Sequence, residues 1–374
     1  MKKIGIINYQ YSCSNYGAVL QAAALHWYID KTFTVECEHI NYIPSRKKTS
    51  QLRKFKVFIG DFLRYIGVKK QTIKHDSFKN SYVFEDFRKA WLPRSPIVYS
   101  SLEQLKSSEL AYDYVIVGSD QVWRPSYTED STMVYFLSFV GDSVKRIAYA
   151  ASFGNDHWEC SADDELTRFT RLELDKFSAI SVREDSGINV CKEVFGCEDI
   201  SHVLDPTLLA GKEFFDQILA ESDEFLEEKV VYYKLELDEK FTSFVSSLCE
   251  QFNLASENIY YKDLKRSYYY ESVENWVNKI KNGKVIVTDS FHCICLAIIY
   301  EKDFLYYPND NRGLSRLESL LKMLEIKDRI YIDTEVNPIE YYASLDKIDY
   351  TRVNSLLESL RVQSGEYLEN ALSS

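Results

Sequence analysis

Residues 3–29, KIGIINYQYSCSNYGAVLQAAALHWYI, show how the fold begins. Lys3–Tyr9 is short and rich in isoleucine, which predicts a buried strand. The polar stretch Gln10–Ser14 follows, and Asn15 can cap a helix whose apolar residues recur at helical spacing: Ala18, Ala22, Leu25 and Ile29. A buried strand that leads into a helix is typical of the start of an open α/β domain.

The same strand-then-helix pattern returns along the chain, at Asp113–Gly118, Arg146–Ala151, Ala179–Val182, Lys229–Leu235 and Lys284–Thr288. Strands that alternate with helical segments favour two parallel-sheet domains over a β-sandwich. Pro206 disfavours helix in the residue before it, so we expect the boundary near residues 202–207. The predicted domains are residues 1–200 and 201–340, followed by an amphipathic helix within residues 341–374.

Composition narrows the class of protein. The 374 residues carry 45 basic and 57 acidic side chains, a net charge of −12, which argues against a general affinity for nucleic acid. The apolar run at the N-terminus is too short for a signal peptide, and no stretch approaches the ~20 apolar residues of a membrane helix. Eight scattered cysteines are typical of free thiols in a reducing compartment, so we expect a cytoplasmic protein.

One segment of the chain differs in charge. Residues 45–94 contain 14 Lys/Arg and 4 Asp/Glu, a local charge of +10, and so form a basic insertion in the first domain. Within it, Leu52–Ile66 mixes basic and bulky apolar residues, which is typical of a helix that lies on an anionic membrane surface. The alternative is a solvated helix that packs its apolar side on the domain.

The loop Tyr11–Gly17 lies beyond the carboxyl end of the first predicted strand, where open α/β sheets bind ligands. The free N–H groups of the next helix favour an anion there. Alternatively, Asn15 only caps the helix and Gly17 only relieves crowding. The sequence contains neither G-x-G-x-x-G nor G-x-x-x-x-G-K-[ST], which counts against a dinucleotide site and a P-loop.

Polar side chains also follow the next predicted strand, in Val117–Arg124. Asp120 and Gln121 offer planar polar groups to sugar hydroxyls, and Trp123 offers a ring to a sugar C–H face. The alternative is a turn capped by Ser119 or Asp120, with Trp123 in the core.

Thr288–His292 ends a predicted strand, and the apolar run Cys293–Tyr300 predicts a buried helix. His292 then falls in the first turn of that helix, and a histidine can exchange protons near neutral pH. The alternative is a histidine satisfied by local capping. Cys293 and Cys295 lie on different helix faces, and no second pair has ligand spacing, so we expect core cysteines and no metal site.

Two arginines follow predicted strands. Arg183 comes directly after one strand, and Arg312 follows Phe304–Tyr307. A guanidinium at such a position can hold a phosphate or carboxylate through paired hydrogen bonds. Either arginine can equally be part of a salt bridge.

Taken together and in order, these motifs resemble the polysaccharide pyruvyl transferase family. The resemblance rests on Ile4–Ile7 with Asn15–Gln21, Val117–Trp123, Ser181–Glu184, Leu204–Thr207, Thr288–His292, and Asn311 with Arg312. It spans about Ile4 to Leu324, and six ordered motifs rarely arise by chance. One departure is Cys293, where the family often has glycine.

The resemblance implies a GT-B-like architecture, in which two Rossmann-like domains face a central cleft and the terminal helix returns toward the first domain. The implied reaction transfers an enolpyruvyl group from phosphoenolpyruvate to a sugar, forming a pyruvate ketal and releasing phosphate. Phosphoenolpyruvate is then a co-substrate, and no cofactor is needed. The acceptor would be a hexose of a polysaccharide precursor, and a polyprenyl-linked oligosaccharide would place the basic insertion at the inner membrane surface.

The resemblance also assigns roles to residues. Those implied for catalysis are His292, Arg183 and Arg312, and those implied for donor binding are Arg183, Ser290, His292, Asn311 and Arg312. We expect the acceptor to contact Asn15, Tyr16, Asp120, Gln121 and Trp123.

Rival functions remain open from the sequence. A nucleotide-sugar glycosyltransferase would share the architecture, and a non-catalytic saccharide-binding protein would share the cleft. A Rossmann reductase is disfavoured by the missing glycine motif.

Overall fold

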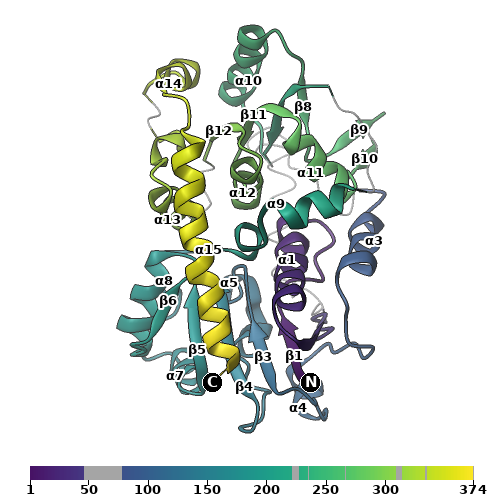
Figure 1. Cartoon of the computed structure of the whole chain (residues 1–374), viewed down its shortest axis with the longest axis vertical. Helices are drawn as coiled ribbons and strands as arrows, with labels where there is room; N and C mark the ends of the chain where they lie inside the picture. Colours follow the sequence, from purple (N-terminus) through teal and green to yellow (C-terminus); the bar gives the residue numbers. More distant parts are fainter. Residues whose placement is uncertain are drawn as a thin grey trace, which may run out of the picture.

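The computed structural model describes residues 1–45, 78–220, 227–234, 236–265, 267–308, 314–332 and 335–373. The chain forms two lobes, each built around a parallel sheet (Figure 1). The six strands of the first sheet are β1 (Lys2–Ile7), β2 (Val35–His39), β3 (Tyr114–Val117), β4 (Lys145–Ala151), β5 (Phe177–Val182) and β6 (Ile200–His202). The four strands of the second are β7 (Lys229–Tyr233), β8 (Ser256–Asn258), β11 (Gly283–Thr288) and β12 (Asp303–Tyr306).

All six predicted strands are present, and their ends lie within two residues of the predicted ones. β1 is apolar on both faces, with Ile4, Ile6 and Ile7 fully buried, as expected for a central strand of a parallel sheet that is covered on both sides. The predicted α/β class with two parallel sheets is therefore confirmed.

Helices cover both sheets. Those that follow first-sheet strands are α1 (Tyr16–Thr32), α3 (Tyr82–Trp91), α4 (Leu102–Lys106), α5 (Pro125–Thr128), α6 (Thr132–Tyr135), α7 (Glu165–Leu174) and α8 (Asp185–Val190). The helix α9 (Pro206–Leu219) connects the lobes. The second lobe adds α10 (Glu239–Phe252), α11 (Val273–Lys281), α12 (Phe291–Ile299), α13 (Ser315–Met323), α14 (Pro338–Ser344) and the hairpin β9 (Lys262–Leu264)–β10 (Ser267–Tyr269).

The strand order shows where each sheet opens a ligand crevice. The first sheet runs β2-β1-β3-β4-β5-β6, so the chain reverses its direction of travel between β1 and β3. The second runs β12-β11-β7-β8, with the reversal between β7 and β11. Open parallel sheets bind ligands beyond the carboxyl ends of the strands at such a reversal.

One hydrophobic core joins the lobes. Tyr16 and Leu20 of α1 and Phe214 of α9 belong to the same buried cluster as Trp276 of α11 and Leu296 of α12. The two sheets are therefore held by shared packing and not only by a linker.

The last helix, α15 (Tyr350–Ser373), runs along both lobes (Figure 1). Val353 and Leu357 pack in the core that joins the lobes, whereas Leu368 and Leu372 pack with Ile4 under the first sheet. The chain thus returns to the lobe where it began, and both termini lie at the same end of the molecule.

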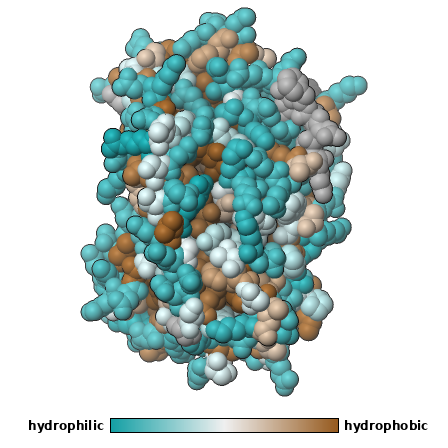
Figure 2. Space-filling model, viewed as in Figure 1, coloured by the Kyte–Doolittle hydropathy of each residue, from teal (hydrophilic) through white to brown (hydrophobic). Residues whose placement is uncertain are grey.

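The face shown in Figure 2 is mostly hydrophilic, with hydrophobic residues in smaller areas between. Across the described residues, no helix has the length and apolar character needed to cross a membrane. The stretch Leu52–Ile66 of the basic insertion lies outside the described residues, so its predicted membrane contact remains a prediction.

Candidate functional site

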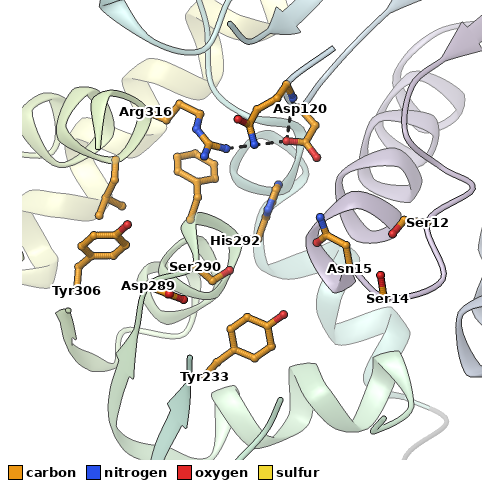
Figure 3. Close-up of a pocket in the computed structure, with 13 residues that line it drawn as sticks. Ser12, Ser14, Asn15, Asp120, Tyr233, Asp289, Ser290, His292, Tyr306 and Arg316 are labelled. Atoms are coloured by element: carbon orange, nitrogen blue, oxygen red, sulfur yellow. Dashed lines mark hydrogen bonds and ion pairs between the residues drawn. The ribbon is translucent and has the colours of Figure 1, made fainter. Parts of the chain in front are cut away.

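A cavity of about 330 Å³ lies between the lobes, where the two strand reversals face each other (Figure 3). Loops after β1 and β3 contribute Ser12, Ser14, Asn15, Asp120 and Gln121. The second lobe contributes Tyr233, Asp289, Ser290, Phe291, His292, Tyr306, Arg316 and Leu317. Since both sheets direct the carboxyl ends of their strands at this cavity, it is the candidate functional site.

Five predicted site residues meet in this cavity: Asn15, Asp120, Gln121, Ser290 and His292. They come from three segments that lie far apart in the sequence, and each segment follows a predicted strand. Asn311 and Arg312 lie outside the described residues.

His292 lies in the first turn of α12, as predicted. Ser290 caps the helix by accepting a hydrogen bond from the Cys293 N–H at 3.4 Å. The imidazole is largely buried, with Nε2 3.7 Å from Asp205 Oδ2. On its other side it packs against Gly17 of α1, where a Cβ would lie 2.0 Å from Nδ1.

Arg183 does not line the cavity, although it was predicted to bind the donor there. Its side chain is only 1% exposed, and its guanidinium donates to Asp120 Oδ1 at 2.9 Å and to Asp205 Oδ2 at 2.6 Å. It also lies 4.8 Å from the centre of the ring of Phe291, which itself lines the cavity. Arg183 is therefore paired with two carboxylates next to the cavity and is not one of the residues that line it.

Arg183 and the other positive charges near it shift the pKa values of the Asp120 and Asp205 carboxyl groups. Burial alone would raise the pKa of Asp120, but the positive charges of Arg183, His292 and Arg316 together outweigh burial and lower it. For Asp205, burial is likewise outweighed by His292 and Arg183, and the pKa lies well below its ordinary value. Both carboxylates are consequently ionised at neutral pH.

Trp123 and Tyr16 also lie outside the cavity, which corrects the prediction that they contact the acceptor. Trp123 is fully buried and donates from Nε1 to the Tyr135 carbonyl at 3.1 Å, stacked on Phe136. Tyr16 is 1% exposed and stacks on Trp276 with ring centres 4.8 Å apart. Both aromatic rings are core residues, because the loops turn inward immediately beyond the polar residues that face the cavity.

Arg316 is the main cavity residue that the sequence did not reveal. It lies in the first turn of α13, with a side chain that is 14% exposed. Its nearest anionic partner is Asp120, with Nη1 4.0 Å from Oδ1, and its Nε is buried without a hydrogen-bond partner in the described part of the chain. Burial and the charge of Arg183 lower the pKa of Arg316. The only sequence signal was an arginine beside the apolar face of an amphipathic helix.

Asp289 was also missed as a cavity residue. Its carboxylate is buried, with Oδ2 3.9 Å from the Lys234 ammonium. That ammonium donates to the Pro308 carbonyl at 3.2 Å. The negative charge of Asp289 is therefore compensated from the second lobe, as that of Asp120 is compensated by Arg183.

Three helices begin at the cavity. Asn15 caps α1, Ser290 caps α12, and Arg316 lies at the start of α13. The N-terminus of a helix carries a partial positive charge and free N–H groups, which favour an anion. Because the two acids are already paired, the cavity is suited to an anionic ligand that meets Arg316 and His292.

Metal ligation has little support in the described ranges. No group of three or more His, Cys, Asp or Glu side chains there could hold a metal ion. Cys293 and Cys295 are buried in α12, as predicted, and burial raises the pKa of both thiols.

Comparison with solved structures identifies the fold. The UDP-GlcNAc 2-epimerase from Neisseria meningitidis bound to UDP-GlcNAc is similar over 99% of this chain and 100% of that chain, with a TM-score of 0.50 and 11% identity. S. aureus MnaA with UDP gives a TM-score of 0.49 and 12% identity, over 97% of this chain and 91% of that chain. At 11% identity the likeness to the Neisseria epimerase shows the fold alone, and that fold is GT-B, as predicted.

Comparison by sequence identifies the family. A search of curated proteins finds no match. The sequence profile of the family described as polysaccharide pyruvyl transferase, however, matches residues 15–311. That range is well over half of the 374 residues and contains Asn15, Asp120, Gln121, Ser290 and His292. The chain therefore belongs to the polysaccharide pyruvyl transferase family.

Proposed function

We propose that this protein transfers the enolpyruvyl group of phosphoenolpyruvate to a hexose of a polysaccharide precursor, forming a pyruvate ketal and releasing phosphate. One observation carries the proposal: His292 and Arg316 line the same interdomain cavity, at which three helices begin. Family membership supports a transferase that acts in polysaccharide synthesis.

The donor has two anionic groups, a phosphate and a carboxylate. Arg316 and the N–H groups at the start of α12 are suited to bind them, with Ser290 beside them. Family resemblance adds Asn311 and Arg312 to the donor residues in this proposal.

The reaction needs a proton donor and a proton acceptor. Protonation of the methylene carbon of phosphoenolpyruvate forms an oxocarbenium ion at C2, which a sugar hydroxyl attacks with loss of its proton. The C2–O bond to phosphate then breaks, and a second hydroxyl closes the ketal with loss of its own proton to the released phosphate. His292 gives the first proton and takes back the proton of the attacking hydroxyl, a role that typically accelerates a reaction by about 10²–10⁴-fold.

The acceptor lies on the side of the first lobe in this proposal. Asn15, Asp120 and Gln121 line that side of the cavity and can bind hydroxyl groups. Arg183 contributes by keeping Asp120 ionised and fixed, and not by touching the substrate.

The cellular setting is a further part of the proposal. The acceptor is a polyprenyl-linked oligosaccharide at the inner face of the cell membrane, and the basic insertion at residues 45–94 attracts the enzyme to that surface from the cytoplasm. Phosphoenolpyruvate is the co-substrate, and no separate cofactor takes part.

Donor binding tests the proposal. We would titrate phosphoenolpyruvate and UDP separately into the wild type, Arg316→Gln and Lys322→Gln by calorimetry. Lys322 is the matched control, since it lies on the same helix but is exposed and pairs with Asp185 at 3.4 Å. We expect saturable binding of phosphoenolpyruvate, weakened about 10- to 100-fold in Arg316→Gln, because a charge-assisted hydrogen bond contributes about 1.5–3 kcal/mol.

A contrary outcome would favour the glycosyltransferase alternative. The Neisseria epimerase of the same fold is bound to UDP-GlcNAc, so a nucleotide is the natural competing ligand. Binding of UDP without binding of phosphoenolpyruvate would reject pyruvyl transfer.

A further inference from the structure

The two ring nitrogens of His292 have different surroundings. Nε2 is buried, has no hydrogen-bond partner within the described ranges, and lies 3.7 Å from Asp205 Oδ2. Nδ1 lies on the side of Gly17, at the first turn of α1. Since Nε2 is enclosed beside a carboxylate, Nδ1 is the nitrogen left for a molecule in the cavity.

Asp205 is held in place as an ionised carboxylate. Oδ2 accepts hydrogen bonds from Arg183 at 2.6 Å and Ser119 at 3.0 Å. Oδ1 accepts from the Thr207 N–H at 3.0 Å and the Thr207 hydroxyl at 2.7 Å. The Arg183 guanidinium and the Thr207 N–H can only donate, so both carboxylate oxygens are fixed as acceptors and Asp205 needs no proton of its own.

An ionised carboxylate facing Nε2 determines which nitrogen carries the proton in the neutral ring. A lone pair on Nε2 would repel Asp205, whereas an N–H there is attracted. The separation of 3.7 Å is longer than a hydrogen bond, and such contacts often tighten when substrate binds.

We propose that Asp205 is a positioning residue that keeps the proton of neutral His292 on Nε2, so that Nδ1 exchanges protons with the substrates. The inference rests on the proposed function for the identity of those substrates. In the reaction, the imidazolium gives its Nδ1 proton to the methylene carbon, and the neutral ring then takes the proton of the attacking hydroxyl at Nδ1.

This assignment makes the site depend on both lobes. Asp205 caps α9 directly after β6 of the first sheet, and Gly17 belongs to α1, whereas His292 belongs to the second lobe. The first lobe thus orients the proton-transfer group that the second lobe supplies.

Nitrogen NMR tests the inference without any substrate. The protein contains six histidines, and ¹⁵N-histidine labelling with His292→Gln identifies the His292 signals by difference. Two-bond nitrogen–proton correlations at a pH where the ring is neutral distinguish the two tautomers. We expect the Nε2–H form to dominate in the wild type. A wild type in which the Nδ1–H form dominates would overturn the inference, whatever the variants show.

Two variants sharpen the test. Asp205→Asn replaces the fixed acceptor by an amide, and we expect the share of the Nε2–H form to fall. Glu184→Gln is the matched control, because it removes a buried carboxylate 3.9 Å from the same Arg183 without contact to His292, and should leave the tautomer unchanged. A folded Asp205→Asn protein with the wild-type tautomer would overturn the inference.

The outcome is separable from that of the proposed function. The tautomer can be wrong while phosphoenolpyruvate still binds and reacts, and phosphoenolpyruvate can fail to bind while the tautomer is as expected. Each experiment therefore rejects its own claim.

Discussion

Arg183 and Arg316 approach the same oxygen of Asp120 but have opposite surroundings. Arg183 lies 2.9 Å from Asp120, 2.6 Å from Asp205 and 3.9 Å from Glu184, and those charges raise its pKa in spite of burial. Arg316 lies 4.0 Å from Asp120, and burial lowers its pKa. A buried arginine whose charge is compensated by the protein is structural, whereas one left without close partners is suited to a ligand anion.

The largest effect we expect is on stability. Arg183→Gln leaves Asp120 and Asp205 buried without their cation and should destabilise the fold by about 3–5 kcal/mol, the usual consequence of breaking a buried pair. Arg316→Gln should change stability far less, because the one carboxylate contact that Arg316 makes among the described residues is long. Urea denaturation of both variants measures the difference. Equal losses of unfolding free energy would contradict the contrast between the two arginines.

Crowding of His292 should have the next largest effect. In Gly17→Ala, the added Cβ would lie 2.0 Å from Nδ1, so the imidazole must move. A displacement of about 1 Å at a reacting group typically lowers turnover about 10²-fold. Phosphate release from phosphoenolpyruvate in the presence of a hexoside measures it.

Gly141→Ala is the matched control for that change, since a Cβ there would meet nothing within 4 Å. Similar losses in both variants would show that the His292–Gly17 contact does not matter for turnover.

The depressed pKa of Asp205 predicts a pH dependence of stability. An acid whose pKa is lower in the folded state stabilises the fold above its unfolded pKa of about 3.9, and that contribution is lost as the pH falls below it. Asp205→Asn should therefore lose less stability than the wild type between pH 6 and pH 3. Parallel curves from urea denaturation across that range would contradict this.

The smallest effect tests the correction to Trp123. Trp123→Phe shortens a buried side chain and removes the hydrogen bond to the Tyr135 carbonyl, which should destabilise the fold by about 1–3 kcal/mol. Because the ring does not line the cavity, KM for a sugar acceptor should stay within about twofold. If KM for the acceptor rises while stability hardly changes, Trp123 does contribute to acceptor binding.

Much of the scaffold could be predicted from the sequence, because each buried strand is a short apolar run and polar residues follow it directly. Asn15, Asp120 and His292 were found since each follows a buried strand, and parallel strands direct their carboxyl ends to one edge. Position along a strand does not show which way a side chain turns, so Trp123 was assigned to the cavity although it turns into the core.

Partners distant in the sequence account for the other differences. Arg183 was expected to meet a ligand because nothing local shows that Asp120 and Asp205 surround it. Arg316 was missed because its role depends on the placement of α13 against the first lobe, where Ser319 accepts from the Asp185 N–H at 3.0 Å.

The most direct test of the account follows the fate of the donor. We would incubate the wild type and His292→Gln with [3-¹³C]phosphoenolpyruvate, UDP-glucose and a panel of hexosides, and record carbon NMR spectra with phosphate and UDP assays. The account predicts a ketal methyl signal and one phosphate released per pyruvate transferred, with both lost in His292→Gln. Release of UDP with phosphoenolpyruvate left intact would contradict it.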